Sequence, residues 1–485
     1  MKDDAEQRAA ALEEASQEFL ARWPEYRATQ ELDDLRARDY ARLDQLGEVY
    51  LDYTGAGLYG ASQVKEHVRL LESHVFGNPH SRNPASAQMS EWVERGRGDV
   101  LEYFHASPDE YVAIFTPNAT GALKLVGEAY PFAPGGLYLL TFDNHNSVNG
   151  IREFARARGA RIRYIPLSIP ELLADEEQLS AALAARPSGA HCLFAYPAQS
   201  NFSGAQHDLG WVERAQAAGW DVLLDAAAFV PTNPLNLSRV KPEFVTLSFY
   251  KMFGYPTGIG CLIAKRSVLH KLHRPWFAGG TITVASVQGD RYFLADGPEA
   301  FEDGTVDFLN IPGVEIGLKH LRQAGLGKIH ERVRCLAQWL IGELDALHHS
   351  NGRPLVRIYG PGARGPRGGT VTMNFYDSDG EVIDHLRIEE LAAREHISIR
   401  TGCFCNPGGG EAALGLRAEE LSACFHQAEA EHRSRFTLED LRMCIDAKST
   451  GAVRVSFGIA SNFADAWRFA EFARTFRDCR AGALR

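Results

Sequence analysis

Short apolar runs alternate with amphipathic stretches through the middle of the chain. Runs this short and this apolar are typical of strands that are buried on both faces, and strands that alternate with helices indicate a mostly parallel sheet. We therefore predict an α/β fold whose large domain, residues 60–310, contains a mostly parallel seven-stranded sheet. The runs that predict its strands are YVAIFT, LYLLTF, RIRYIPL, HCLFAYP, DVLLDA, FVTLSF and GIGCLIA.

The pattern changes at both ends of the chain. Residues 6–48 show helical spacing with interleaved charges, which predicts an N-terminal helical arm over residues 1–59. From LNIPGVEIGLKHLRQAG onward, a long helical stretch is followed by fewer strands, in GGTVTMNFY and GAVRVSFGI. This change predicts a smaller α+β domain over residues 311–485, which carries the loop RTGCFCNPGGG at residues 400–410.

Composition narrows the classes of protein. The chain has 485 residues, of which 45% are hydrophobic and 23% charged, as in ordinary globular proteins. A net charge of −11 without clustered Lys and Arg argues against nucleic-acid binding. No apolar run reaches the roughly 18 residues of a membrane-spanning helix, and the N-terminal sequence is too acidic for a signal peptide. We therefore predict a cytoplasmic protein that binds no membrane and keeps its eight cysteines reduced.

The first predicted strand is followed by a candidate phosphate site. In open α/β sheets, ligands bind at the carboxyl ends of the strands. After YVAIFT, the turn PNATG opens a helix, where the backbone amides from Ala119 onward and the Thr120 hydroxyl suit an anion. The alternative for this turn is an ordinary N-cap, because Asn and Thr are common caps.

Three more strand ends carry candidate chemistry. Asp225 ends DVLLD, Ser248 and Lys251 follow the strand FVTLS, and His145 follows LYLLTF. Taken singly, Lys251 could be a surface lysine and His145 a hydrogen-bonded structural residue. A phosphate site, a buried carboxylate, a strand-end lysine and a stacking imidazole together predict a pyridoxal phosphate pocket. A nicotinamide site would need a Gly-x-Gly-x-x-Gly turn, and none follows these strands.

A longer series of motifs follows one order along the chain. They are NATGALKLVGEA, DNHNSV, PAQSNFSG, LLDAAAFVPTNPLNLS, SFYKMFGYPTGIG, FAGGT, FEDGTVDFL, RTGCFCNPG and GAVRVSFG. In this order they resemble the class V, fold-type I pyridoxal phosphate enzymes, and most of all the cysteine-desulfurase domain of molybdenum cofactor sulfurases. The resemblance implies a homodimeric enzyme that converts L-cysteine to L-alanine and transfers the sulfur to an acceptor.

The resemblance also implies roles for individual residues. Lys251 would form the Schiff base with the cofactor, Asp225 would pair with the pyridine nitrogen, and His145 would stack on the ring. Arg454 would bind the substrate carboxylate, with Arg400 and Asn201 as further substrate contacts. The other cofactor contacts would come from Ala119, Thr120, Asn201, Ser248, Tyr250 and Thr281, the last from a neighbouring subunit.

The cysteine pair in RTGCFCNPGGG can be interpreted in several ways. The resemblance implies that Cys405, rather than Cys403, carries the persulfide. Only a thiolate is a competent nucleophile, so we expect Cys405 on an exposed, mobile loop near Arg400 or Arg454. The alternatives are a disulfide, packing as small hydrophobes and a zinc site. The further zinc ligands would be Cys424, His426 and Cys444.

Three features depart from the resemblance. The family's second domain, which handles the molybdenum cofactor, would need several hundred residues beyond Arg485, so we expect either that this domain is a separate protein or that the sulfur goes to another acceptor. Gly409 and Gly410 stand where many relatives carry another cysteine, and Ala228 stands where some desulfurases carry a glutamine. These two differences concern the details of sulfur transfer rather than the cofactor.

Two other functions stay open from the sequence. Class V scaffolds also support C–S lysis, aminotransfer and epimerisation of small amino acids, and the fold alone does not separate these reactions. A non-enzymatic sulfur-relay protein is the other alternative. Replacing Cys405 should abolish desulfuration but not the other reactions. Absorbance from a bound cofactor would distinguish an enzyme from a relay protein, which would show none.

Overall fold

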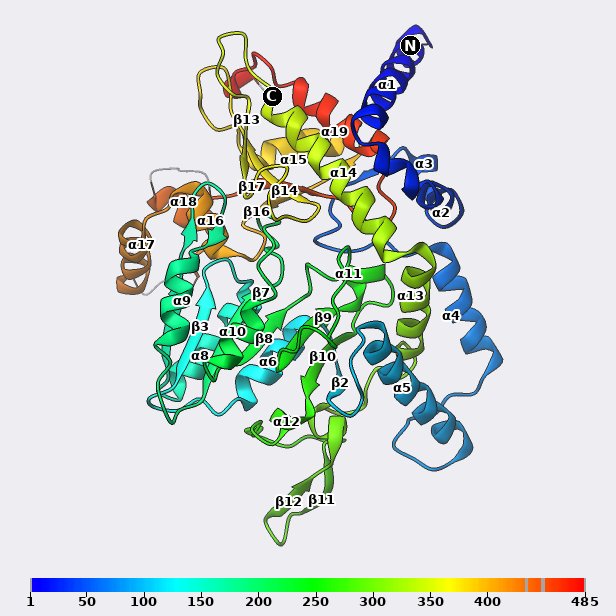
Figure 1. The fold of residues 1–485 in the computed structure, drawn as a ribbon, viewed down its shortest axis with the longest axis vertical. Helices are drawn as coiled ribbons and strands as arrows, with labels where there is room; N and C mark the ends of the chain where they lie inside the picture. The colour runs from blue at the N-terminus through cyan, green and yellow to red at the C-terminus, as the bar shows by residue number, and fades with distance from the viewer. Residues whose placement is uncertain (1, 432–434, 446–449, 484–485) are drawn as a thin grey trace.

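A seven-stranded sheet forms the centre of the computed structural model, which describes residues 2–431, 435–445 and 450–483 (Figure 1). Only β10 runs antiparallel to its neighbours within this sheet. Each of the predicted apolar runs forms one of the strands, so the predicted α/β fold with its mostly parallel sheet is confirmed. In spatial order the strands are β2 (Tyr111–Thr116), β10 (Gly260–Lys265), β9 (Phe244–Ser248), β8 (Asp221–Asp225), β7 (Cys192–Pro197), β3 (Leu137–Thr141) and β4 (Arg161–Ile165).

Both faces of this sheet are buried. In β3, for example, Leu137 and Leu139 belong to one hydrophobic cluster, and Tyr138 and Leu140 belong to another. Successive side chains of a strand point to opposite faces, so a strand between two clusters must be apolar at every position. One face packs against α6 (Ala119–Ala129) and α8 (Ile151–Ala157); the other packs against α5 (Pro84–Tyr103), α9 (Glu176–Ala184), α10 (Trp211–Ala217) and α13 (Ile311–Ala324).

A four-stranded antiparallel sheet lies in the C-terminal part of the chain. The two runs predicted as strands there are β14 and β17. The strands in order are β13 (Val356–Tyr359), β14 (Thr370–Phe375), β17 (Ala452–Ser456) and β16 (Arg400–Gly402). The helices of this part are α14 (Leu326–Asp345), α15 (His385–Arg394), α16 (Pro407–Leu414), α17 (Ala418–Ala430), α18 (Leu438–Cys444) and α19 (Phe463–Arg474).

The N-terminal residues form the predicted helical arm and then join the C-terminal part. The arm consists of α1 (Lys2–Arg22), η1 (Pro24–Thr29), α2 (Glu31–Asp39) and α3 (Arg42–Leu46), and α1 extends from the body in Figure 1. The next strand, β1 (Val49–Tyr50), pairs in parallel with β15 (Ile397–Ser398), and Asp52 forms a bridge with Ser456 of β17. The domain boundaries at residues 60 and 311 stay a prediction.

A hairpin projects at the opposite end of the molecule from α1 (Figure 1). Its strands are β11 (Ile282–Ser286) and β12 (Arg291–Leu294), neither of which was predicted from the sequence. Within the described part of the chain, no helix has the length and apolar character needed to cross a membrane. The remaining elements are α4 (Ala61–Ser73), α7 (Asn146–Asn149), α11 (Phe249–Phe253), α12 (Arg266–Leu269), β5 (Leu167–Ser168), β6 (Leu173–Ala174), η2 (Gly297–Phe301) and η3 (Ala481–Ala483).

Candidate active site

A cavity of about 130 Å³ lies at the carboxyl ends of the parallel strands. Its lining comes from the segments that follow β2, β3, β8 and β9, the strand ends at which the sequence predicted a site, and from the segment after β7, where the resemblance placed Asn201. The predicted residues on this lining are Ala119, Thr120, His145, Asn201, Asp225, Ser248, Tyr250 and Lys251. Other lining residues were not predicted from the sequence, among them Asn118, Ser147 and Gln199.

Lys251 is the amine of the cavity. The short helix α11 begins directly after β9 and carries Lys251 on its first turn. Burial lowers the pKa of the Lys251 amine, the Asp225 carboxylate opposes this effect, and Arg454 adds to it. A lowered pKa increases the neutral fraction of the amine near neutral pH, which is the form that acts as a nucleophile or a base.

Asp225 is the carboxylate of the cavity. It ends β8, is 8% exposed, and accepts hydrogen bonds at Oδ1 from the Ala227 N–H (3.1 Å) and the Thr246 hydroxyl (3.4 Å). Its charge opposes the effect of burial on both Lys251 and His145. The Asp225 carboxylate therefore favours the protonated form of both the Lys251 amine and the His145 ring.

His145 precedes α7, and its ring orientation is fixed by the helix. Its Nδ1 accepts a hydrogen bond from the Ser147 N–H at 3.1 Å, so the neutral ring carries its proton on Nε2. Burial lowers the pKa of His145, with Asp225 acting in the opposite direction. The ring is therefore neutral at pH 7, which suits contact with a planar ligand.

The N-terminus of α6 holds a group of hydroxyls. Asn118 caps this helix by accepting from the Gly121 N–H at 2.9 Å. The Ala119 N–H donates to Ser248 Oγ (2.8 Å), and the Thr120 and Ser147 hydroxyls are hydrogen bonded at 2.8 Å. Hydroxyls and amides at a helix N-terminus suit an anion. The candidate phosphate residues of the sequence analysis are thus brought together here.

Two arginines from the small sheet meet one carboxylate from the N-terminal part. Arg454 and Arg400 are register partners on β17 and β16. Asp52 binds Arg454 Nη2 through Oδ1 (2.9 Å) and Arg400 Nε through Oδ2 (2.9 Å). Arg454 also donates to the Asn201 carbonyl (2.8 Å), while its buried Nε has no hydrogen-bond partner in the described structure. Asp52 was not singled out from the sequence.

Cys405 lies beside the cavity with an exposed side chain, whereas Cys403 is half-buried. The Cys405 carbonyl accepts from the Asn146 N–H at 2.7 Å, directly next to His145. A negative charge on Cys405 raises the pKa of Lys251 and of Tyr250. The thiol and the amine predicted to cooperate are therefore electrostatic neighbours. The backbone contact anchors a loop that the sequence analysis expected to be mobile.

Thr281 does not line the cavity of its own chain. It is fully buried, and its hydroxyl donates to the Ala278 carbonyl at 2.9 Å. It directly precedes β11 of the projecting hairpin. The expectation that Thr281 reaches the cavity of a neighbouring subunit stays a prediction.

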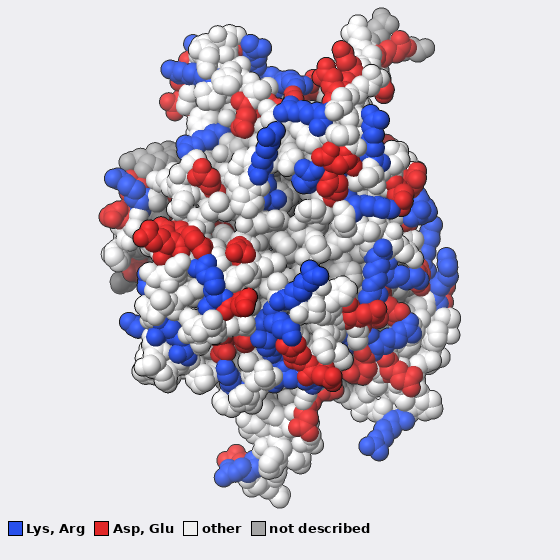
Figure 2. Space-filling model, in the orientation of Figure 1, with Lys and Arg blue, Asp and Glu red and all other residues white. Residues whose placement is uncertain are grey.

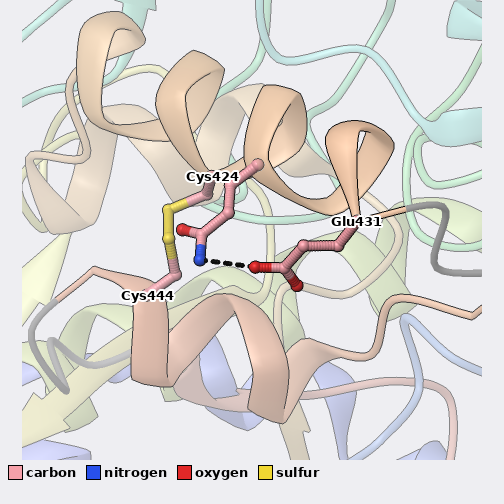
Figure 3. The surroundings of a disulfide bond; sticks show 4 residues. Cys424, Glu431 and Cys444 are labelled. Atoms are coloured by element: carbon pink, nitrogen blue, oxygen red, sulfur yellow. Dashed lines mark hydrogen bonds between the residues drawn. A yellow bond between two sulfur atoms is a disulfide. The ribbon is translucent and has the colours of Figure 1, made fainter.

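Two cysteines away from the cavity are joined in a disulfide (Figure 3). Cys424 on α17 and Cys444 on α18 are bonded, with their Cα atoms 5.9 Å apart. The prediction that all cysteines stay reduced is therefore wrong for this pair, and so is the interpretation of these two cysteines as zinc ligands with His426. The physical reason is the packing of α17 against α18, which brings together residues 20 positions apart.

The described residues offer one cluster with metal-ligand geometry, formed by Glu25, Glu331 and Cys335. Arg334 already pairs with both carboxylates there, at 2.7 Å from Glu25 and closer to Glu331. A guanidinium between the two acidic groups occupies the position that a cation would need, so we assign no metal to this cluster.

The chain is similar to proteins of known type over most of its length. A family model described as aminotransferase class-V matches residues 49–469. The molybdenum cofactor sulfurase of Solanum lycopersicum is 35% identical over 96% of this chain and 60% of its own length. That of Bos taurus is 37% identical over 91% of this chain and 51% of its own length. The chain thus spans about half to three fifths of these curated relatives.

Solved structures share the fold. The cysteine desulfurase of Thermococcus onnurineus NA1 aligns with a TM-score of 0.73 at 22% identity, covering 91% of this chain and 97% of its own. A mutant of C-DES with glycine linked covalently to its pyridoxal phosphate cofactor aligns with a TM-score of 0.67 at 17% identity, covering 91% and 99%. At these identities the likeness establishes the fold-type I architecture.

Proposed function

Because the chain belongs to the class-V aminotransferase family, we propose that it is a pyridoxal phosphate-dependent cysteine desulfurase. It takes sulfur from L-cysteine onto Cys405 and releases L-alanine. The observation that carries the proposal is an exposed thiol beside a cavity that holds a half-buried lysine and a buried aspartate. The similarity to molybdenum cofactor sulfurases supports sulfur transfer as the outcome.

The residues of the cavity fit pyridoxal phosphate. The Lys251 amine would hold the aldehyde, Asp225 the protonated pyridine nitrogen, and His145 one face of the ring. The phosphate would bind at the N-terminus of α6, where the hydroxyls of Thr120 and Ser248 converge with backbone amides. When bound, the cofactor withdraws electrons from the α-carbon of an attached amino acid.

Side chains of the protein bind the substrate and remove its α-proton. Arg454 binds the substrate carboxylate in a charge-assisted pair, with Arg400 beside it, and Asp52 orients both guanidinium groups. Lys251, whose pKa is lowered by burial, takes the α-proton as a general base. Because water competes little in the buried site, it favours both the ion pair between Arg454 and the substrate carboxylate and the proton transfer to Lys251.

The sulfur step requires Cys405 as a thiolate. Its sulfur attacks the sulfur of the substrate, and a new S–S bond forms between them. The bond between the substrate sulfur and Cβ breaks, its electron pair passes to Cβ, and Cβ takes up a proton to become the methyl group of alanine. Lys251 returns a proton to the α-carbon, which completes L-alanine. Cys405 then carries a persulfide, which passes its outer sulfur to an acceptor.

The proposal is tested by incubating the purified protein with L-cysteine. We expect an absorbance band at about 410–430 nm from the bound cofactor and roughly one alanine per Cys405 without a reductant. With a thiol reductant, alanine and sulfide should accumulate in equal amounts. D-cysteine is the matched control and should give no alanine. Pyruvate in place of alanine would identify a C–S lyase, and no band after added pyridoxal phosphate would exclude the enzyme.

We also propose that the protein is a homodimer that uses the β11–β12 hairpin as part of its interface. Val287 at the turn is 100% exposed and Phe293 on β12 is 68% exposed. In Figure 2 the hairpin, at the bottom of the view, is largely free of charged side chains. An exposed apolar patch of this kind marks an interaction site, and Thr281 next to the hairpin would then lie near a second chain.

Charged substitutions on the hairpin should therefore weaken the dimer. We expect the double variant Val287→Lys, Phe293→Glu to sediment as a monomer at concentrations at which the parent sediments as a dimer. Leu386→Glu is the matched control, because Leu386 is an exposed apolar residue (58%) on α15, away from the hairpin. Equal masses for the parent and the hairpin variant in analytical ultracentrifugation would contradict this interface.

A further inference from the structure

Asn406 has a fully buried side chain directly after Cys405. Buried amides are almost always hydrogen bonded. Its Nδ2 donates to the Asp143 carbonyl (2.7 Å) and to Asn201 Oδ1 (3.0 Å), and its Oδ1 accepts from the Gly409 N–H (2.9 Å). Both N–H groups and the carbonyl of the amide are thus used.

These bonds join three separate segments. Asp143 lies in the loop after β3, which also carries His145, while Asn201 lies in the segment after β7 and lines the cavity. The bond from Gly409 makes Asn406 the N-cap of α16. One side chain therefore fastens the beginning of α16 to the two loops that border the cavity.

The backbone directly before Asn406 adopts an unfavourable conformation, which requires stabilising contacts. Phe404 and Cys405 have φ angles of +56° and +55°, in the left-handed region that residues with a Cβ rarely occupy. Their carbonyls accept hydrogen bonds from Asn201 Nδ2 (2.6 Å) and from the Asn146 N–H (2.7 Å).

The Phe404 ring gives the loop an apolar anchor. The ring is 8% exposed, lies 5.3 Å from the Phe202 ring, and contacts the Arg454 guanidinium at 4.6 Å. The two residues that bracket Cys405 are thus both buried and bonded, whereas Cys405 itself is exposed. This arrangement holds the Cys405 backbone in place and leaves its side chain exposed.

We propose that Asn406 is a positioning residue, which holds the Cys405 thiol where it can attack the sulfur of a substrate bound in the cavity. This role rests on the proposed desulfurase function. It acts through the tether to Asp143 and Asn201 rather than through contact with the reacting atoms. None of these hydrogen bonds reaches Lys251, so we expect proton transfer there to depend on the tether less than the attack by the thiol does.

Two variants separate the tether from the helix cap. Asn406→Ala removes both. Asn406→Asp keeps an oxygen that can cap α16 and lacks the N–H groups of the tether. Asn462→Ala is the matched control, because Asn462 caps α19 by accepting from the Asp465 N–H at 3.0 Å in a part of the chain that does not line the cavity.

Three measurements on the cofactor-loaded protein test the role. The first is alanine formation from L-cysteine, which we expect to fall by about 100-fold in both Asn406 variants, as for a misplaced reacting group. The second is exchange of the α-hydrogen of L-alanine in D₂O, which needs Lys251 and no thiol and should fall far less than alanine formation. The third is backbone hydrogen exchange in peptides that cover residues 403–406, which should become faster in both variants.

The outcomes that would overturn the proposal are distinct. Parental alanine formation in Asn406→Asp would show that only the cap matters. An equal loss of α-hydrogen exchange would indicate a general structural role, and so would comparable losses in Asn462→Ala. If the parent protein forms no alanine at all, the desulfurase function fails instead, while faster backbone exchange in the variants would still report the tether.

Discussion

Replacing Cys405 with alanine should reduce alanine formation from L-cysteine by about 10³-fold or more, to the rate without enzyme. The reason is that the substrate sulfur then has no nucleophile to accept it, although the cavity and its amine are unchanged. The measurement is the initial rate of alanine release by the purified variant in the presence of a reductant, together with its absorbance at about 410–430 nm, which should match that of the parent.

Cys403→Ala is the matched control for Cys405→Ala. Cys403 lies two residues away in the same loop but is half-buried, whereas Cys405 is exposed. We expect this variant to retain most of the parental rate. Undiminished alanine formation by Cys405→Ala would remove the persulfide mechanism, and loss in Cys403→Ala alone would move the nucleophile to that residue.

Replacing Lys251 with alanine should lower alanine formation by about 10²–10⁴-fold, the usual contribution of a positioned general base. Because burial lowers the pKa of Lys251, its neutral form begins to predominate at a lower pH than for a free lysine. Borohydride reduction provides an independent measurement. It should attach the cofactor covalently to the peptide that contains residue 251 in the parent, and to no peptide in the variant.

The control for this variant is Lys319→Ala. Lys319 is an exposed lysine on α13 that pairs with Glu66 at 2.8 Å. It should retain the parental rate and the borohydride adduct. Alanine formation at the parental rate by Lys251→Ala, or a borohydride adduct on another lysine, would contradict the assignment.

Most strands of the large sheet could be predicted because burial on both faces makes them largely apolar, whereas the edge strand β4 has exposed arginines at alternate positions. The segments Cys192–Pro197 and Phe244–Ser248 are buried throughout. The β11–β12 hairpin escaped prediction because its side chains are largely exposed, so no continuous apolar run marks it. Its pattern of β-branched and aromatic residues on both sides of a glycine turn was the signal that could have found it.

The cavity residues could be predicted because each follows a strand end, which is a local signal. Asp52 and Asn406 could not be found in this way. Asp52 binds Arg454, which lies 402 residues further along the chain, and Asn406 binds residues more than 200 positions before it. Contacts of this kind depend on how the two sheets meet. The Cys424–Cys444 bond was missed for a similar reason, because it depends on the packing of α17 against α18.

The order of the site residues along the chain has a consequence for biosynthesis. All strands of the large sheet end by Lys265, and the cofactor-side residues of the cavity lie between Asn118 and Lys251. Arg400, Cys405 and Arg454 are translated after all of these residues. Because domains generally fold from the N-terminus during synthesis, a nascent chain can complete the cradle for the cofactor before it contains the thiol. Sulfur chemistry is thus withheld until the segment that contains Cys405 and Arg454 has been added.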